Sequence, residues 1–440
     1  MTGTFEGRGA TWIGQLELAN ALRAEAVIES DRAFADWARV LVRLHHEPLG
    51  FVSVPSPGGV VDVDRIGAMA WRQFELEIRK HLSQDRLSCP DGLPLAGLGG
   101  WEACAADARA QDAPDLPISV VVCTRDRPKL LWNALSTLRQ VDYGAFEVLV
   151  VDNAPSSTET RTCVEEFVRI DPRFRYLTEP RAGVAWARNL GLAEAQHDWV
   201  AFADDDVLVD PWWLRGVARG ICRDTEVACV TGLVPPASLL EPAQRYFDER
   251  MSWTSSLQPR VYDLDKRRGE DALYPFSAGI FGTGANSAFD RRFVQRVGGF
   301  DTTLGAGSRT KGGEDLDMFL RVVLAGRALA YEPAAVIWHI HRSDSAVLKG
   351  QMYDYGLGLT AFLAKWALKP STTWQVLKRV PPGAFRIASL LGRARVSTPA
   401  GPRPAASVGY KRAELRGMIA GPFVYCLARR AARTIPNSQA

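Results

Sequence analysis

The chain has 440 residues, of which 47% are hydrophobic and 23% charged, the balance of a soluble globular protein. This length predicts a large domain with smaller additions, because it exceeds the size of one ordinary domain. The formal net charge is only +3, which gives no indication of a nucleic-acid partner, and we expect none.

Cysteine usage and hydropathy both favour a cytoplasmic location. Seven cysteines are scattered along the chain without a CxxC pair, which predicts no disulfide framework and a reducing compartment. Because apolar residues are ample, folding should require neither a disulfide nor a structural metal. Met1–Gln15 lacks the pattern of a signal peptide, and no run approaches about eighteen uncharged apolar residues, so we expect no transmembrane helix.

Residues 1–116 are expected to form a small α+β accessory module followed by a linker. The tract from 90 to 115 is rich in Gly, Ala, Pro and Asp, as linkers are. Periodicity predicts the elements before it. They are a helix over Gln15–Trp37, strands over Val40–Leu44 and Phe51–Val54 joined by a turn over 45–50, and a helix over Arg65–Leu82.

Residues 117–369 are expected to form the main domain, which has the pattern of an α/β fold. Apolar runs of strand length alternate with helical stretches, which predicts βαβ units and a mostly parallel sheet with helices on both faces. Ligands of such sheets bind at the carboxyl ends of the strands. The predicted strands are Ile118–Cys123, Phe146–Val151, Phe174–Leu177 and Trp199–Ala203, and the predicted helices are Lys129–Gln140, Thr158–Ile170 and Gly183–Ala195.

Residues 370–440 are expected to form a helical, basic C-terminal extension. It contains the structure-breaking tracts Pro381–Gly383 and Pro399–Pro404, and its last segment, Leu415–Arg433, mixes apolar residues with arginines. Such a segment suits an anionic membrane surface, and it equally suits a helix that packs on the protein. A peripheral position at the inner face of the cell membrane is therefore one of two open interpretations.

Polar residues follow each of the four predicted parallel strands. A single aspartate there often only caps a helix, but three adjacent carboxylates repel one another unless a cation is present. Mg²⁺ and Mn²⁺ sites combine one or two carboxylates with substrate phosphates. The triplet at the fourth strand therefore predicts a divalent cation and a diphosphate-bearing substrate. The four sets are Thr124 to Arg127, Asp152 and Asn153, Glu179 to Arg181, and Asp204 to Asp206.

Two later motifs are further candidates. Glu314, Asp315 and Asp317 follow two glycines and open a predicted helix; the helix dipole alone would favour them there, but a base that deprotonates an alcohol would also suit this place. His339 and His341 lie on one face of an extended segment. They are either ordinary histidines or contacts of a metal or diphosphate.

From Ile118 to about Lys369 the chain resembles glycosyltransferase family two, the inverting enzymes with the GT-A fold. The ordered set of motifs is more specific than any one of them. The motifs are Val121 to Pro128, Val150 to Asn153, Gly183 to Asn189, Asp204 to Asp206, Gly284 to Asn286, Gly298 to Asp301, Gly313 to Asp315, and Trp338 with His339.

The resemblance implies roles for individual residues. Asp315 would be the catalytic base, with Glu314 beside it, and a divalent cation (Mn²⁺ or Mg²⁺) would be the cofactor. The metal ligands would come from Asp204, Asp206, His339 and His341. The nucleotide-sugar contacts would come from Thr124, Arg127, Asp152, Gly183, Arg188, Asn189, Asp204, Asp205, Gly284 and Asn286.

The resemblance also implies the reaction. A sugar would pass, with inversion, from a nucleoside-diphosphate sugar to a hydroxyl of a glycan, a lipid-linked acceptor or a small molecule. UDP is expected because most of the family uses it. The chain lacks the many transmembrane helices of processive synthases, so we expect it to add one or a few sugars, as in bacterial cell-envelope polysaccharide synthesis.

Two other functions remain as alternatives. A sugar-phosphate nucleotidyltransferase would share the sheet and the metal, but it usually carries a glycine-rich loop after the first strand, and Thr124 to Pro128 contain no glycine. A catalytically inactive sugar- or nucleotide-binding scaffold would typically have lost the acidic triplet or the base, and both are present here.

Overall fold

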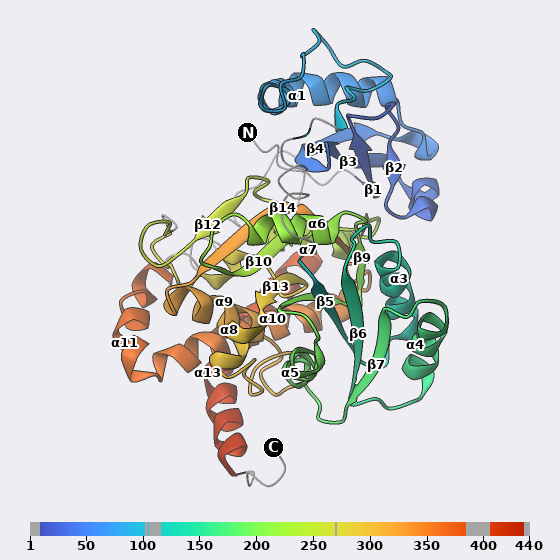
Figure 1. Ribbon diagram of the computed structural model, residues 1–440. Coiled ribbons are helices and arrows are strands. Elements are labelled where there is room, and N and C mark those ends of the chain that lie inside the picture. The colour runs from blue at the N-terminus through green and yellow to red at the C-terminus, as the bar shows by residue number, and fades with distance from the viewer. Residues whose placement is uncertain (1–8, 102–103, 105–115, 269–270, 384–404, 435–440) are drawn as a thin grey trace.

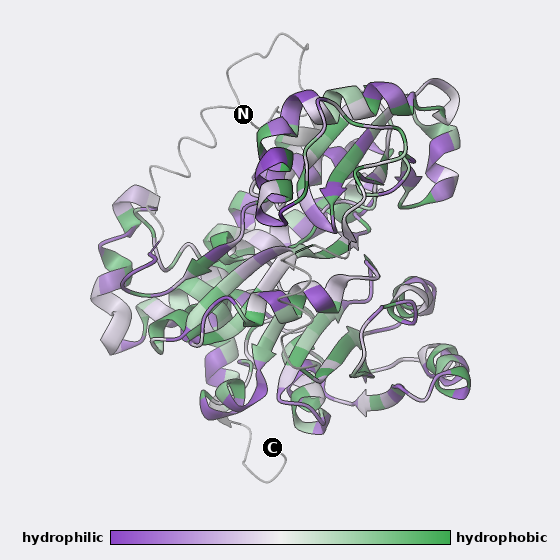
Figure 2. Cartoon of the chain, turned by 45° about the horizontal axis from the view of Figure 1, so that its top comes forward, coloured by the Kyte–Doolittle hydropathy of each residue, from purple (hydrophilic) through white to green (hydrophobic). Residues whose placement is uncertain are grey.

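The computed structural model describes residues 9–101, 104, 116–268, 271–383 and 405–434, and these ranges contain two sheets (Figure 1). The smaller sheet belongs to the N-terminal module, and the larger sheet forms the centre of the main domain. Hydrophobic residues are concentrated in the strands of both (Figure 2). The predicted α/β class, with a small α+β module and a helical C-terminal region, is confirmed.

The N-terminal module contains more strand than its sequence predicts. The helix expected over Gln15–Trp37 is wrong, because this range holds the end of one strand, the short strand β2 and a 3-10 helix. The cause is non-local: β1 pairs in parallel with β3, which comes some twenty residues later. The elements are β1 (Thr11–Glu17), β2 (Glu25–Ala26), the 3-10 helix Glu29–Phe34, β3 (Trp37–Leu44), β4 (Glu47–Pro55), the 3-10 helix Pro57–Gly59, and α1 (Val63–Gln84).

The structure confirms that the other elements predicted for this module are strands and helices as expected, although their bounds differ. The two expected strands are present but longer, so that the turn between them shrinks to His45 and His46. The expected helix is α1, which covers one face of the sheet through residues such as Ile66, Ala70 and Ile78. Half of the predicted linker, at positions 102–103 and 105–115, lies outside the described residues.

The first half of the large sheet follows the sequence prediction closely. Strands β7, β6, β5 and β8 lie side by side in parallel. Val120 and Val122 pack with α3 and α4 on one face, whereas Val121 packs with α5 on the other. The elements are β5 (Ile118–Thr124), α3 (Pro128–Leu138), β6 (Phe146–Asn153), α4 (Glu159–Ile170), β7 (Phe174–Glu179), α5 (Val184–Glu194) and β8 (Trp199–Asp204).

The second half of the sheet is mixed. β13 is antiparallel to both β8 and β10, and β14 is parallel to β10. The far end of β14 also pairs with the short strand β9, which places His339 opposite Val207. The elements are β9 (Val207–Val209), α6 (Trp213–Ile221), β10 (Val227–Leu233), β11 (Ser238–Leu239), α7 (Pro242–Met251), β12 (Arg260–Tyr262), the 3-10 helix Ala278–Phe281, β13 (Asn286–Asp290), α8 (Arg291–Arg296), α9 (Glu314–Leu324) and β14 (Ala328–His339).

Three helices complete the described chain: α10 (Ser345–Ala367), α11 (Pro370–Leu377) and α13 (Ala405–Thr434). α13 lies against α10, and glycines allow the close approach: a Cβ on Gly417 would come within 2.0 Å of the Tyr353 carbonyl oxygen. The described part of the extension is therefore helical, as predicted, and its last helix packs on the main domain. In the described part of the chain, no helix has both the length and the apolar character needed to span a membrane.

The N-terminal module is docked on the main domain next to α6 and β14 (Figure 1). β11 of the main domain pairs with β1, so it adds a strand to the module's sheet. Ile13 and Leu41 of the module share a buried cluster with Val336 and Trp338 of β14. The module and the strand that carries His339 are thus parts of one packed body.

Candidate active site

The three consecutive aspartates stand at the end of β8, and the structure gives them different environments. The carboxylate of Asp205 is buried and accepts hydrogen bonds from Thr124 Oγ1 at 2.8 Å and from Arg127 Nη1 at 3.0 Å. Asp204 pairs in register with Cys123, and its side chain remains 37% exposed. The middle acid therefore holds the strand ends together, whereas the side chain of Asp204 is the most accessible of the three.

Asp206 lies beside His339 because β9 pairs with the end of β14. The backbone N–H of Ile340 donates to the Asp206 carbonyl oxygen at 2.9 Å, and His339 Nε2 lies 3.5 Å from Asp206 Oδ1. Arg127 and Arg342 approach the other carboxylate oxygen at 3.3 and 3.4 Å. Sequence reasoning missed Arg342, although its position directly after His341 was the available signal.

The two histidines predicted to share a face do so, with their Nδ1 atoms 2.9 Å apart. Burial lowers the pKa of His339 well below its usual range, and the nearby His341 and Arg342 lower it further. His339 is therefore neutral at physiological pH. His341 has a different acidic neighbour, since its Nε2 is 3.9 Å from Asp248 Oδ1.

The chemistry of this pair fits a divalent cation. Asp206 offers a hard carboxylate oxygen and His339 offers a neutral imidazole nitrogen, and both suit Mn²⁺. Within the described residues, three or more closely grouped ligands of this kind occur only in the N-terminal module, so this pair would need oxygen atoms from a substrate to complete a coordination shell. This is the pattern of a cation that binds together with phosphates.

Asp315 faces the same edge of the sheet from the start of α9. Its Oδ2 accepts a hydrogen bond from the backbone N–H of Gly284 at 2.9 Å. A Cβ on Gly284 would lie 2.9 Å from the Asp315 Cβ and 3.0 Å from Arg188 Nη1, so this close approach requires glycine. The carboxylate is thus held in place by the backbone and remains partly exposed.

Arg188 is buried between the two acidic groups. It donates to Glu314 Oε1 at 3.1 Å, and its Nη2 lies 3.6 Å from Asp204 Oδ1. Burial raises the pKa of both Glu314 and Asp204 to about 7; Arg188 opposes this rise, and neighbouring aspartates add to it. One guanidinium therefore links the end of β8 to the start of α9.

Asp152 is the last residue of the candidate site. It lies at the end of β6, opposite Thr124 in the strand register. Its Oδ2 accepts a hydrogen bond from the hydroxyl of Tyr176 at 2.9 Å, whereas its Oδ1 is buried without a hydrogen-bond partner among the described residues. Burial raises the pKa of Asp152, and the bond with Tyr176 lowers it. A buried acceptor in this state points to a ligand that brings an N–H or O–H group.

Three residues predicted as nucleotide-sugar contacts have structural partners instead. The Asn286 amide is almost fully buried; it accepts from Trp213 Nε1 and donates to two backbone carbonyls. The Asn189 amide bonds the backbone of Phe300 in both directions. Gly183 caps α5 at φ 134°, and its N–H donates to Asn153. This geometry does not favour ligand roles for the Asn189 and Asn286 side chains, because their polar atoms serve the fold.

Comparisons with known proteins find similarity to glycosyltransferases. Residues 119–298 match the model of the glycosyl transferase family 2. The chain is similar to the pre-mycofactocin glycosyltransferase of Mycobacterium tuberculosis, at 30% identity over 245 residues, covering 55% of this chain and 47% of that protein. It is also similar to polypeptide N-acetylgalactosaminyltransferase 6 of Mus musculus, at 24% identity, covering 54% and 40%. The chain thus spans about half, or less, of the length of these curated relatives.

Among solved structures, the chain is similar to the mannosyltransferase PcManGT from Pyrobaculum calidifontis in complex with GDP-Man and Mn²⁺. The identity is 19% and the TM-score 0.45, covering 74% of this chain and 94% of that one. The segment that matches the family model includes the acidic triplet and ends at Gly298, before Asp315 and His339. Through this segment, which makes up less than half of its length, the chain is similar to glycosyl transferase family 2.

Proposed function

We propose that the protein is an inverting glycosyltransferase that moves a sugar from a nucleoside-diphosphate sugar to an acceptor hydroxyl. The observation that carries this proposal is that two groups of side chains lie at one edge of the sheet. One group is suited to bind the diphosphate and its cation, and the other is suited to act as a base. Asp206 and His339 form the first, and Asp315 forms the second. Arg188 lies between them, in contact with Asp204 and Glu314.

Asp152 and Thr124 would hold the nucleoside. The unpartnered Oδ1 of Asp152 needs a hydrogen-bond donor, and the N3–H of uracil is such a group. Tyr176 would orient the carboxylate through its hydroxyl. We expect UDP, as in most of the family, and guanine and thymine nucleotides carry comparable N–H donors.

Asp206 and His339 would hold a divalent cation, with Asp204 as a further ligand from the same strand end. When bound, the cation would neutralise negative charge on the leaving diphosphate. Arg127 and Arg342 now contact the Asp206 carboxylate. Their guanidinium groups are suited to binding phosphate oxygens once the donor is present.

Asp315 would act as the base. Its carboxylate takes the proton of the acceptor hydroxyl as that oxygen forms a bond to the anomeric carbon. The bond from this carbon to the diphosphate oxygen breaks on the opposite face, so the configuration inverts. The backbone N–H of Gly284 fixes the carboxylate in place, which favours proton transfer in one orientation.

The two alternatives are less favoured by this geometry. A nucleotidyltransferase would need a phosphate-binding loop after β5, but here the helix α3 starts at Pro128 after a loop without glycine. An inactive nucleotide-binding scaffold could use the buried acceptor on Asp152, but it would have no use for a carboxylate held in place by Gly284.

Thermal shift with nucleoside diphosphates, with and without Mn²⁺, tests the donor site, because a ligand of the folded state raises the melting temperature. A Mn²⁺-dependent shift with UDP that is lost in Asp206→Asn is expected. Asp315→Asn should keep this shift while donor turnover falls by about 10²–10⁴-fold. No shift with any nucleotide, or near-normal turnover of Asp315→Asn, would contradict the proposal.

We also propose that α13 contacts an anionic membrane surface. Its exposed face carries Ile419, Phe423 and Leu427, which are 63, 70 and 55% exposed. Arginines precede and follow this apolar stripe on the same face, at positions 412, 416 and 430. An apolar stripe flanked by arginines suits the interface of an anionic bilayer.

Pelleting with anionic vesicles tests this contact. The protein should pellet with phosphatidylserine-containing vesicles and not with neutral ones, and Phe423→Glu together with Leu427→Glu should abolish pelleting. Leu76→Glu, at a leucine that is 77% exposed in the N-terminal module, is the matched control. Equal pelleting of all three proteins would show that α13 does not serve this purpose.

A further inference from the structure

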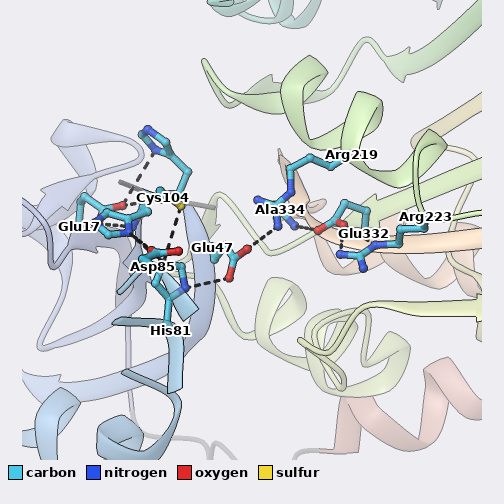
Figure 3. A network of polar contacts seen from close by, with 11 residues as sticks. Glu17, Glu47, His81, Asp85, Cys104, Arg219, Arg223, Glu332 and Ala334 are labelled. Atoms are coloured by element: carbon cyan, nitrogen blue, oxygen red, sulfur yellow. Dashed lines mark hydrogen bonds and ion pairs between the residues drawn. The ribbon is translucent and has the colours of Figure 1, made fainter. Parts of the chain in front are cut away.

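Four metal-ligating side chains meet inside the N-terminal module, away from the proposed active site. His45 comes from the turn between β3 and β4, His81 and Asp85 from the end of α1, and Cys104 from the segment after it. Their ligand atoms all lie within 4.8 Å of one another, and all four residues are buried. Figure 3 shows His81, Asp85 and Cys104 pointing toward one another.

The ligand atoms are specific and close. His45 Nδ1 lies 2.8 Å from His81 Nε2, and Asp85 Oδ2 lies 3.2 and 3.0 Å from these two nitrogens. The Cys104 sulfur lies 3.9 Å from His81 Nε2. The set therefore presents two imidazole nitrogens, one carboxylate oxygen and one sulfur to a common point.

Each histidine also has a hydrogen-bond acceptor outside the cluster. These acceptors indicate which ring nitrogen carries a hydrogen and which nitrogen faces the other ligand atoms. His45 Nε2 lies 2.7 Å from the Gly99 carbonyl oxygen, which only accepts, so Nε2 carries the hydrogen and Nδ1 is free to ligate. His81 Nδ1 lies 3.1 Å from Glu47 Oε2, so Nδ1 carries a hydrogen, and Nε2 of the neutral ring is the nitrogen that can ligate. Two ring nitrogens and a carboxylate oxygen therefore face one another, an arrangement that a metal ion or a shared proton between them would stabilise.

The turn that carries His45 is itself unusual. His45 and His46 both have positive φ, 50° and 64°, in a two-residue turn where asparagine and glycine are favoured. The Glu17 carboxylate accepts both of their backbone N–H groups, at 2.9 and 3.0 Å. Non-glycine residues persist in this conformation where a side chain has a role there.

We propose that His45, His81, Asp85 and Cys104 bind one structural Zn²⁺ ion. Zinc prefers four ligands drawn from imidazole, thiolate and carboxylate. The charges balance, because the Asp85 carboxylate and the Cys104 thiolate together neutralise a divalent cation; the thiol proton is released on binding. Since all four ligands come from the protein and are buried, the site has no open position for catalysis.

The site would also anchor the N-terminal module to the main domain. Glu47 contacts His81 on one side and Arg219 of α6 on the other (Figure 3). The network continues with the ion pair between Arg223, which follows α6, and Glu332 of β14. The ion would hold Cys104 against the end of α1 and would orient Glu47 toward the main domain. The expectation that folding needs no structural metal therefore does not hold under this proposal.

Metal analysis of the purified full-length protein, produced without a polyhistidine tag, tests the site. After dialysis, elemental analysis should find about one zinc per chain in the wild type and in Asp206→Asn, which separates this site from the proposed donor site. Cys104→Ala and His81→Ala should lose the zinc. Cys89→Ala changes a cysteine of the same module outside the cluster and should keep it.

A second measurement does not depend on how the variants fold. Exchange of the wild-type metal for Co²⁺ should give the near-ultraviolet absorption of a thiolate-to-cobalt bond, and chelation should lower the melting temperature. A wild type that holds no stoichiometric zinc and does not respond to added Zn²⁺ would overturn the proposal. In that case a proton between the histidines would take the place of the ion.

Discussion

At the residue scale, the site is distinguished by how each carboxylate is held. Asp205 has protein donors for both oxygens, Asp315 has the Gly284 N–H, and Asp152 has one oxygen without a partner among the described residues. These differences distinguish a structural acid from the proposed base and the proposed nucleoside contact, although all three are aspartates at strand or helix ends.

Asp152→Asn should weaken nucleotide binding. The amide replaces one acceptor oxygen with a donor, and loss of a hydrogen bond to a charged group costs about 1.5–3 kcal/mol, or roughly 10–100-fold in Kd. Titration calorimetry with UDP and Mn²⁺ measures this loss. Asp126→Asn, two residues beyond β5 and bonded to Ser156, is the control, and equal effects of both changes would argue against the assignment.

Glu314 should make stability depend on pH. Burial raises its pKa to about 7 from an ordinary value of 4.5, so the folded state binds the proton more tightly than the unfolded state does. This contribution is fully present below about pH 4.5 and is lost as the pH rises through 7. Between these values the melting temperature of Glu314→Gln should fall less with pH than that of the wild type, whereas Glu165→Gln on exposed α4 should change nothing.

At the element scale, the start of α9 must lie close to the loop before β13, because the proposed base Asp315 is held by the backbone of that loop. Gly284 makes this possible, since a methyl group there would press against Asp315 and Arg188. The start of α9 also shows why an acidic cluster is hard to interpret from sequence. Glu314 pairs with Arg188, whereas Asp317 turns away to Trp366 and Lys365.

Gly284→Ala should therefore reduce turnover by about tenfold or more, because a small displacement of a catalytic group has a large effect on rate. The fold should persist, with little change in melting temperature. Gly279→Ala is the matched control, since a Cβ there meets nothing within 4 Å. Steady-state kinetics and circular dichroism decide the outcome; an active Gly284→Ala would show that the Asp315 position is not critical.

At the scale of the whole molecule, a chain of contacts joins the N-terminal module to the proposed metal ligands. Arg39 of β3 donates to Asp248 of α7 at 2.7 Å, and Asp248 lies 3.9 Å from His341. His341 contacts His339, which lies beside Asp206. The module therefore supports the orientation of a side chain that belongs to the main domain.

Arg39→Met should weaken Mn²⁺ binding by less than the about 10–100-fold effect of removing a direct outer partner of a metal ligand, because Asp248 and His341 lie between Arg39 and His339. Titration of Mn²⁺ in the presence of UDP measures this, with paramagnetic signal loss as the readout. Arg23→Met removes an exposed arginine of the same module and should bind Mn²⁺ normally. Unchanged Mn²⁺ affinity in Arg39→Met would show that the module does not influence this site.

The sequence by itself determined the parallel half of the large sheet and the polar residues at its edge. Apolar runs such as Ile118–Thr124 are local signals, and the ends of parallel strands must meet at one edge. Local signals did not distinguish side chains that serve the fold, such as Asn286, from those that face a ligand. Their partners, Trp213 and two backbone carbonyls, come from distant segments.

Only the tertiary structure decided the pairing of β1 with β3, the contact of Arg342 with Asp206, and the grouping of His45, His81, Asp85 and Cys104. These four residues are spread over some sixty positions and form no motif of fixed spacing, so only folding brings them together. Contacts between segments far apart in the chain depend on how the elements pack, and no local periodicity encodes that packing.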